Sequence, residues 1–162
     1  MTPSRIFVRL FFWIMLAASL GALAYALIAQ YAFGFEPCIL CQYQRIPYWT
    51  VAAICLVELC VPGVDRKGVA ALISAVFACG AALALYHVGV EQNWWQAGAC
   101  AAQGGVSFNF DDFSSEPVKP ILKSCDSIDW TLFGFSMATY NALVSACLAL
   151  ATAWSARMMK RD

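Results

Sequence analysis

The sequence LFFWIMLAASLGALAYALIAQYAF, from Leu10 to Phe33, decides the fold class of this chain. It contains no charged side chain and is long enough for a transmembrane helix, which needs about 20 mostly apolar residues. Backbone groups in lipid must pair within the segment, so the stretch is predicted to be a helix and not a strand. Its AYA sequence at 24–26 is also a passable signal-peptide cleavage site, and that alternative would leave three spans.

The composition of the whole chain also indicates a membrane protein. Of its 162 residues, 62% are hydrophobic and 12% are charged, whereas a soluble domain is about 45–50% apolar and about 25% charged. The length suits one domain, so residues 1–162 are predicted to form a single integral membrane domain. Because the net charge is zero, nucleic acid is not an expected partner. Because the chain is so apolar, membrane lipid is an expected partner.

Four apolar segments are expected to form the transmembrane helices. They lie at about residues 10–33, 43–61, 69–90 and 130–154. The second is the shortest, and it reaches span length only if it begins near Tyr43. It also carries Glu58 near its far end, to which we assign no role. The predicted fold is therefore an all-α membrane protein, a bundle of four transmembrane helices.

Basic side chains are divided unequally between the two ends of this predicted bundle. Seven lie on the side of the chain termini: Arg5, Arg9, Arg66, Lys67, Arg157, Lys160 and Arg161. Three lie on the other side: Arg45, Lys119 and Lys123. Because cytoplasmic loops are enriched in Lys and Arg, both termini are predicted to be cytoplasmic. A short loop at about 34–42 and a long loop at about 91–129 then face outward.

The eight cysteines fall into two groups of four. One group lies within the predicted spans, where cysteine usually behaves as a small hydrophobic residue: Cys55, Cys60, Cys79 and Cys147. The other group lies in the two outward loops, on the side expected to be oxidising: Cys38, Cys41, Cys100 and Cys125. Four cysteines allow three connectivities, and the sequence alone does not choose among them.

The loop cysteines have three possible uses. They can be structural disulfides, as paired cysteines usually are in secreted domains. They can be a metal site, because C-x-x-C with two more cysteines supplies four sulfur ligands. However, Cys100 and Cys125 are separated by twenty-four residues and these loops contain no histidine, so no metal is predicted. The third use is redox catalysis.

The residues around Cys41 favour redox catalysis. Pro47 is tolerated in the first turn of a helix, so the second span is predicted to begin at about 43–46, with Cys41 just before it. The helix N-terminus and Arg45 would then both stabilise a thiolate at Cys41, which a purely structural disulfide does not need. Alternatively, Arg45 extends to lipid headgroups. A redox cysteine at the membrane surface calls for a lipid-soluble electron acceptor, and a quinone fits.

These residues resemble a known family, the bacterial inner-membrane disulfide-bond formation protein B, DsbB. The resemblance covers nearly the whole chain and includes four spans, the C-x-L-C string Cys38–Cys41, Gln44 and Arg45, and the widely spaced Cys100 and Cys125. It implies an enzyme that reoxidises a periplasmic dithiol oxidase of the DsbA type and passes the electrons to ubiquinone or menaquinone. The outward loops would be periplasmic. A sister protein that serves a dedicated partner, or a scaffold with structural disulfides only, are the alternatives.

The resemblance also implies a role for each catalytic residue. Cys100 would form the mixed disulfide with the partner, and Cys125 would be its loop mate that pairs transiently with Cys38. Cys41 would face the quinone, with Arg45 holding charge beside it.

Two further features are predicted to lie near the outer membrane surface. His87, the single histidine, would lie near the quinone ring by resemblance, and its alternative role is packing or hydrogen bonding. Trp94 and Trp95 are expected in the interfacial aromatic belt. The segment 107–122 has three phenylalanines among acidic residues and is predicted to lie along the membrane surface, with an ordinary loop as the alternative.

Overall fold

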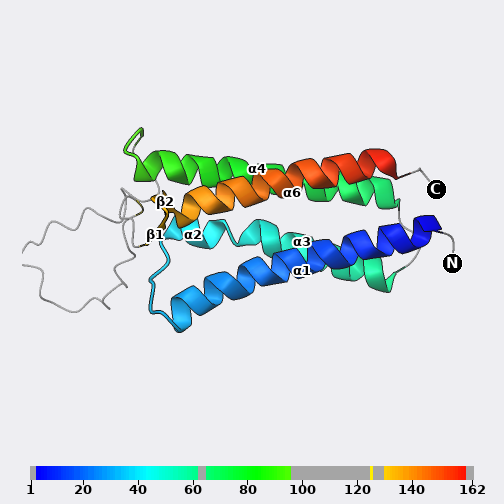
Figure 1. Cartoon of the computed structure of the whole chain (residues 1–162), viewed down its shortest axis with the longest axis horizontal. Coiled ribbons are helices and arrows are strands. Elements are labelled where there is room, and N and C mark those ends of the chain that lie inside the picture. The colour runs from blue at the N-terminus through cyan, green and yellow to red at the C-terminus, as the bar shows by residue number, and fades with distance from the viewer. Residues whose placement is uncertain (1–2, 62–64, 96–124, 126–129, 160–162) are drawn as a thin grey trace, which may run out of the picture.

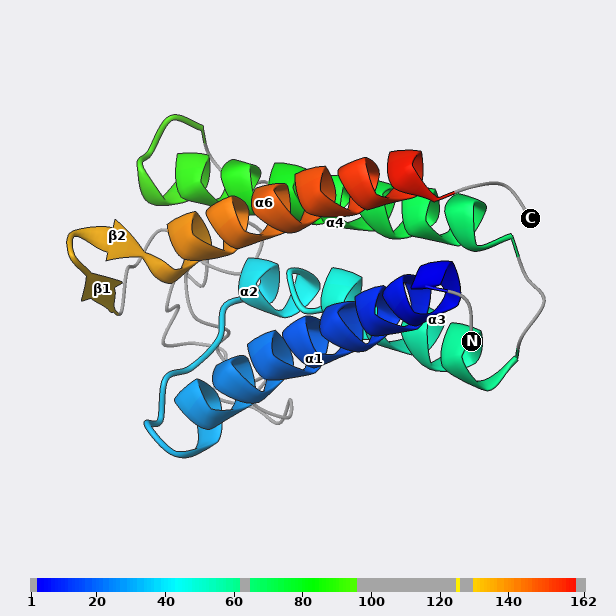
Figure 2. The ribbon, with the colours of Figure 1, turned by 45° about the vertical axis from the view of Figure 1, so that its right-hand side comes forward.

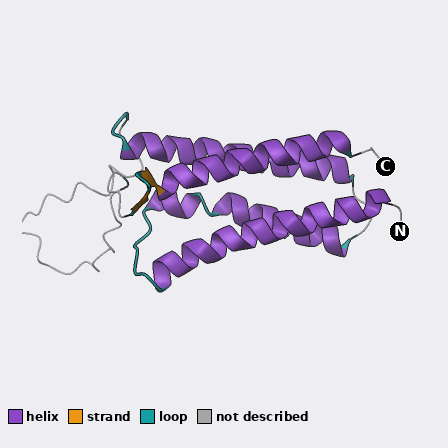
Figure 3. Cartoon of the chain, in the orientation of Figure 1, coloured by secondary structure: helices purple, strands orange, loops and turns teal. Residues whose placement is uncertain are grey.

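A computed structural model of the chain describes residues 3–61, 65–95, 125 and 130–159. Within these residues the chain is mostly helical (Figure 3). The elements, in chain order, are α1 (Pro3–Tyr31), α2 (Ile39–Tyr43), α3 (Ile46–Cys60), α4 (Arg66–Glu91), β1 (Thr131–Leu132), β2 (Phe135–Ser136) and α6 (Met137–Met158). The two short strands form an antiparallel hairpin.

The long helices form a bundle of two neighbouring pairs. Helix α4 packs most extensively against α6, and α1 packs against α3 (Figures 1 and 2). The start of α1 and the end of α6 lie at one end of the bundle, whereas α2 and the β1–β2 hairpin lie at the other (Figure 1). This arrangement agrees with the prediction that both chain termini lie on one side of the bundle and the loop cysteines on the other. Which side is cytoplasmic stays a prediction.

Three helices of the described chain are long and apolar enough to cross a membrane, at Ile6–Tyr31, Arg66–Glu91 and Met137–Met158. These support a multi-pass membrane protein. Helix α3 has 15 residues, which at 1.5 Å per residue reach about 22 Å, less than the roughly 30 Å of a bilayer core. The second predicted span is thus helical from Ile46 to Cys60 but short, and a count of four spans stays a prediction.

Small side chains bring α4 and α6 together. The buried positions of α6 follow one another at alternating steps of four and three residues: Ala138, Ala142, Ser145, Ala149, Thr152 and Ala156. This spacing places them on one face of the helix. Small residues let helix backbones approach closely, which is how helices associate in lipid. The Ser74 hydroxyl of α4 also donates a hydrogen bond to the Ala149 carbonyl of α6 at 2.8 Å.

Helix α3 packs against α4 through a glycine. A Cβ added at Gly80 would lie 3.2 Å from the Pro47 ring, so the first turn of α3 approaches α4 as closely as a glycine permits. One turn along, the Tyr48 ring meets the buried Phe77 edge-on, with centroids 5.7 Å apart. This contact fixes the outer end of α3, which follows directly after the C-x-x-C pair.

The cysteines of the long helices are free thiols. Only Cys55 is buried inside the bundle. Cys60, Cys79 and Cys147 are exposed on its outer surface, among many large apolar side chains such as Trp154. An exterior with many exposed apolar side chains is expected of a surface that faces lipid.

Candidate functional site

The C-x-x-C motif forms its own short helix at the end of the bundle. Cys38 is the N-cap of α2, and its sulfur accepts a hydrogen bond from the backbone N–H of Cys41 at 3.3 Å. The prediction that Cys41 immediately precedes a helix was wrong. Pro47 does lie in the first turn of α3, but residues 39–43 form a separate helical turn before it, so Cys38 takes the capping position.

The two thiols of this motif touch. The Sγ atoms of Cys38 and Cys41 are 3.0 Å apart, both cysteines are free, and Cys38 is buried. The pKa of Cys38 is lowered to about 4, chiefly by a hydrogen bond with the Cys41 thiol and also by contacts with His87 and the Cys41 N–H. Burial opposes this shift. The pKa of Cys41 is raised, because its proton is held against the Cys38 sulfur and because it is buried. In this arrangement the stabilised thiolate is on Cys38, not on Cys41 as expected from sequence.

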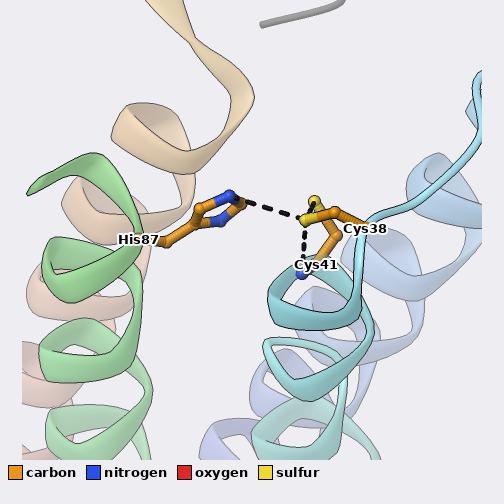
Figure 4. Close-up of side chains that lie close together, drawn as sticks. All are labelled: Cys38, Cys41 and His87. Atoms are coloured by element: carbon orange, nitrogen blue, oxygen red, sulfur yellow. Dashed lines mark hydrogen bonds between the residues drawn. The ribbon is translucent and has the colours of Figure 1, made fainter. Parts of the chain in front are cut away.

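His87 of α4 points at this pair from the opposite side (Figure 4). Its Nε2 atom lies 3.6 Å from the Cys38 sulfur, and its side chain is almost completely buried. Its Nδ1 atom accepts a hydrogen bond from the Gln44 side-chain amide at 2.7 Å. The Glu91 carboxylate lies 3.8 Å from Nε2 and also accepts a hydrogen bond from Ser136. His87 is therefore in direct contact with the redox motif.

Arg45 joins α1 to the start of α3. Its Nη1 atom donates a hydrogen bond to the Gln30 side-chain oxygen of α1 at 2.8 Å. It is the N-cap residue of α3, although its side chain makes no capping hydrogen bond. Arg45 lines the same cavity as Cys41.

A cavity of about 560 Å³ opens between α1 and α6 at this end of the bundle. Its lining includes four alanines of α1 and the apolar residues Met137, Ala138 and Val144 of α6. Cys38, Cys41, Arg45 and His87 form part of the remainder. Ligand pockets commonly have volumes of about 300–1,000 Å³ and a few polar groups in an apolar lining. The cavity therefore has the size and lining of a ligand pocket, with both thiols in its wall.

Comparison with known proteins agrees with this geometry. The model of the family "Disulfide bond formation protein DsbB" matches residues 8–155. The chain belongs to the DsbB family.

Several relatives of this DsbB-family chain match it over most of their length. A disulfide bond formation protein B of Neisseria meningitidis serogroup C is 31% identical over 155 residues, covering 88% of this chain and 91% of that protein. The one of Aromatoleum aromaticum is 27% identical over 162 residues, with 94% and 93% covered. An uncharacterized protein of Rickettsia prowazekii is 31% identical over 145 residues, with 85% and 81% covered. No solved structure gave a significant match.

The second cysteine pair of this DsbB-family protein is described in part. Cys125 is disulfide-bonded and buried, with 2% of its surface exposed. It packs in one apolar cluster with Cys38, Leu40 and Val90, so the structure brings it to the C-x-x-C motif. Cys100 and the predicted surface segment 107–122 lie outside the described residues.

Three side chains of metal-ligating types meet at this site. The ligand atoms of Cys38, Cys41 and His87 lie within 4.8 Å of one another. A structural zinc site uses four protein ligands, and these residues supply three, the number found in catalytic zinc sites. That no metal is bound stays a prediction.

Sequence reasoning missed several polar residues that surround His87. Gln44 was noted only for its place in the motif, and Tyr48, Glu91 and Asn141 were given no role. Asn141 was detectable in principle, because an amide in a transmembrane segment needs a hydrogen-bond partner. Its partner Gln44 is 97 residues away, so the contact itself could not be predicted.

Trp95 folds back onto α4 beside this site. Its indole N–H donates to the Tyr86 carbonyl at 3.1 Å, and its ring stacks on that of Tyr86 with centroids 5.7 Å apart. Gly89 makes room for the indole, because a Cβ there would lie 2.0 Å from it. Trp94 is 69% exposed, which suits the predicted interfacial position.

Proposed function

We propose that the protein is a thiol:quinone oxidoreductase of the bacterial inner membrane. It reoxidises a periplasmic dithiol oxidase of the DsbA type and passes the electrons to ubiquinone or menaquinone. Membership of the DsbB family supports a role in disulfide bond formation. The observation that carries the proposal is the apolar cavity with a free, touching pair of thiols, Cys38 and Cys41, in its wall.

The electron balance of this reaction matches the pair. Oxidation of one thiolate and one thiol to the Cys38–Cys41 disulfide releases two electrons and the Cys41 proton. A bound quinone accepts two electrons and two protons, so the second proton comes from solvent. Arg45 supplies positive charge in the cavity wall, where negative charge develops during the transfer.

The entry of electrons follows from the position of Cys125. The partner's dithiol would reduce a Cys100–Cys125 disulfide, and the Cys125 thiolate would then attack the Cys38 sulfur of the oxidised pair. The sulfur–sulfur bond breaks and its electron pair stays on Cys41, which faces the cavity. Thiol–disulfide exchange needs direct access between sulfurs. The shared cluster of Cys125 and Cys38 supports this route.

A quinone-reduction assay tests the proposal. Purified protein receives a reduced DsbA-type oxidase and quinone, and the loss of quinone absorbance is followed. Cys41→Ser is compared with the matched control Cys147→Ser, which changes a free, exposed cysteine on α6. We expect the control to reduce quinone and Cys41→Ser to fail. If both fail or both succeed, the proposal is refuted.

A small dithiol in place of the protein donor separates the alternatives. Reduction with the small dithiol but not with the DsbA-type oxidase would indicate a dedicated partner. Reduction with neither would favour a scaffold whose disulfides are structural.

A further inference from the structure

A line of buried and partly buried hydrogen bonds runs from Tyr48 of α3 through Asn141 of α6 to the redox thiols. The Tyr48 hydroxyl donates to the Asn141 Oδ1 atom at 2.6 Å, and the Asn141 amide donates to the Gln44 Oε1 atom at 2.6 Å. The Gln44 amide donates to Nδ1 of His87 at 2.7 Å. The line ends at the contact of 3.6 Å between His87 Nε2 and the Cys38 sulfur.

In each of these three hydrogen bonds the donor lies on the Tyr48 side and the acceptor lies on the His87 side. An amide side chain has a donor end and an acceptor end. Because Asn141 donates to the oxygen of Gln44, the nitrogen of Gln44 is left to face His87. A neutral imidazole that accepts at Nδ1 carries its proton on Nε2, since the hydrogen bond of one ring nitrogen sets the protonation of the other. The proton of His87 therefore points at the Cys38 sulfur.

Burial holds this direction in place. Gln44 is 7% exposed and His87 is 3% exposed, so water does not replace a lost partner. Reversing the Gln44 amide would set its donor against the donor of Asn141. Leaving a buried polar group unpaired costs about 1–3 kcal/mol, so the two amides and the ring form one interdependent unit.

We propose that Asn141 is a positioning residue that fixes the orientation of the Gln44 amide and so presents the Nε2–H of His87 to the Cys38 sulfur. Asn141 lies on α6 and touches neither thiol through any contact in the described chain. It acts through Gln44 and His87. Its effect on turnover rests on the proposed function, whereas its effect on the ring and the thiol does not.

This positioning has a chemical consequence. When a disulfide that includes Cys38 is broken with Cys38 as the leaving group, the electron pair of the sulfur–sulfur bond stays on the Cys38 sulfur. A donor at that sulfur stabilises the thiolate and makes it a better leaving group. If the ring proton sat on Nδ1, the lone pair of Nε2 would face the thiolate and repel it.

Other ionisable groups also face His87. From α2 these are Cys38 and Cys41, and from its own helix it is Glu91. Tyr48 of α3 reaches it only through the amides, and Arg45 and Glu36 line the same cavity. The α6 group joined to it through Gln44 is Asn141, which is uncharged. Any test must therefore read the ring and the thiol directly.

The single histidine of the chain allows such a test. Full-length protein with ¹⁵N-labelled histidine, with the first cysteine pair reduced, is studied by NMR at mildly alkaline pH. The nitrogen shifts report which ring nitrogen carries the proton. The rate of Cys38 alkylation, followed against pH by mass spectrometry, reports its apparent pKa. We compare wild type with Asn141→Leu, which removes both the donor and the acceptor.

The matched control is Ser145→Ala. Ser145 also contacts Asn141 and Tyr48, one turn along α6, but it lies outside the route to Gln44. We expect wild type and Ser145→Ala to hold the proton on Nε2. In Asn141→Leu we expect Nδ1–H to appear and the apparent pKa of Cys38 to rise by about one unit, the low end of the range for a hydrogen bond to a charged group.

Two results would overturn the proposal. One is a wild-type ring that carries its proton on Nδ1, which decides the matter even if Asn141→Leu does not fold. The other is a folded Asn141→Leu protein with unchanged ring shifts and unchanged Cys38 pKa. Neither readout uses quinone or a partner protein. If quinone is not reduced but the ring and thiol respond as described, the proposed function fails and this inference stands.

Discussion

Removing the Cys41 thiol should raise the pKa of Cys38. Three hydrogen-bonding groups contact the Cys38 sulfur: the Cys41 thiol at 3.0 Å, the Cys41 N–H at 3.3 Å and His87 Nε2 at 3.6 Å. Cys41→Ala removes the nearest of these groups and keeps the backbone N–H. A hydrogen bond to a charged group contributes about 1.5–3 kcal/mol, which corresponds to about one to two pKa units. From its present value of about 4, the pKa of Cys38 should rise by that amount.

His87→Leu should have a smaller effect in the same direction. Its donor is the most distant of the three, so we expect a rise of about one unit or less. The order of the two variants is therefore a sharper test than either value alone. Cys147→Ser is the control, because it changes an exposed thiol on α6 and should leave the pKa of Cys38 unaltered.

The assay is the pH dependence of alkylation at each cysteine, measured by peptide mass spectrometry on reduced protein. The thiolate is the reactive form, so the midpoint of the rate reports the pKa. The reasoning would be refuted if Cys41, not Cys38, reacted at the lower pH in wild type. It would also be refuted if Cys41→Ala left the Cys38 midpoint where it is.

The remaining predictions concern stability and packing. The lowered pKa of Cys38 means that the unfolded chain binds more protons between pH about 4 and about 9, so thermal stability of the reduced protein should rise with pH across that range. Gly80→Val should lower stability by about 1–3 kcal/mol, because its side chain would press on Pro47. A Cβ at Gly21 would meet nothing within 4 Å, so Gly21→Val is the control in thermal unfolding. Gly89→Ala should displace the Trp95 indole and change tryptophan emission, and the same substitution in a Trp95→Leu background should not. A stability that does not change with pH would contradict the first prediction. Equal losses of stability in Gly80→Val and Gly21→Val would contradict the second. Equal emission changes with Trp95 present and in the Trp95→Leu background would contradict the third.

The sequence predicted the long helices because lipid imposes a simple rule on them. The first apolar run, 10–33, corresponds to α1, which ends at Tyr31, and the third, 69–90, corresponds to α4. The fourth was predicted to start near 130, but α6 starts at Met137. The residues before it form the hairpin, with Phe133 and Gly134 at positive φ in its turn.

The site was predicted only in its covalent pattern. C-x-x-C identified Cys38 and Cys41, since two cysteines three positions apart meet on one helical turn. Which sulfur carries the thiolate depends on whether the helix starts at residue 39 or nearer 46, and helix starts are poorly specified by sequence. The contacts of His87 join helices far apart in the chain, and no local pattern encodes them.

The central claim is that the Cys38–Cys41 pair delivers its electrons to a quinone in the adjoining cavity. The most direct measurement is a single turnover without any partner protein. Protein with the first pair reduced is freed of reductant and mixed with excess quinone, and quinone absorbance and the Cys38–Cys41 disulfide are measured together. The account predicts loss of about one quinone per protein, because a dithiol and a quinone each exchange two electrons, with the disulfide forming at the same rate. Thiols that stay reduced while the quinone persists would contradict it.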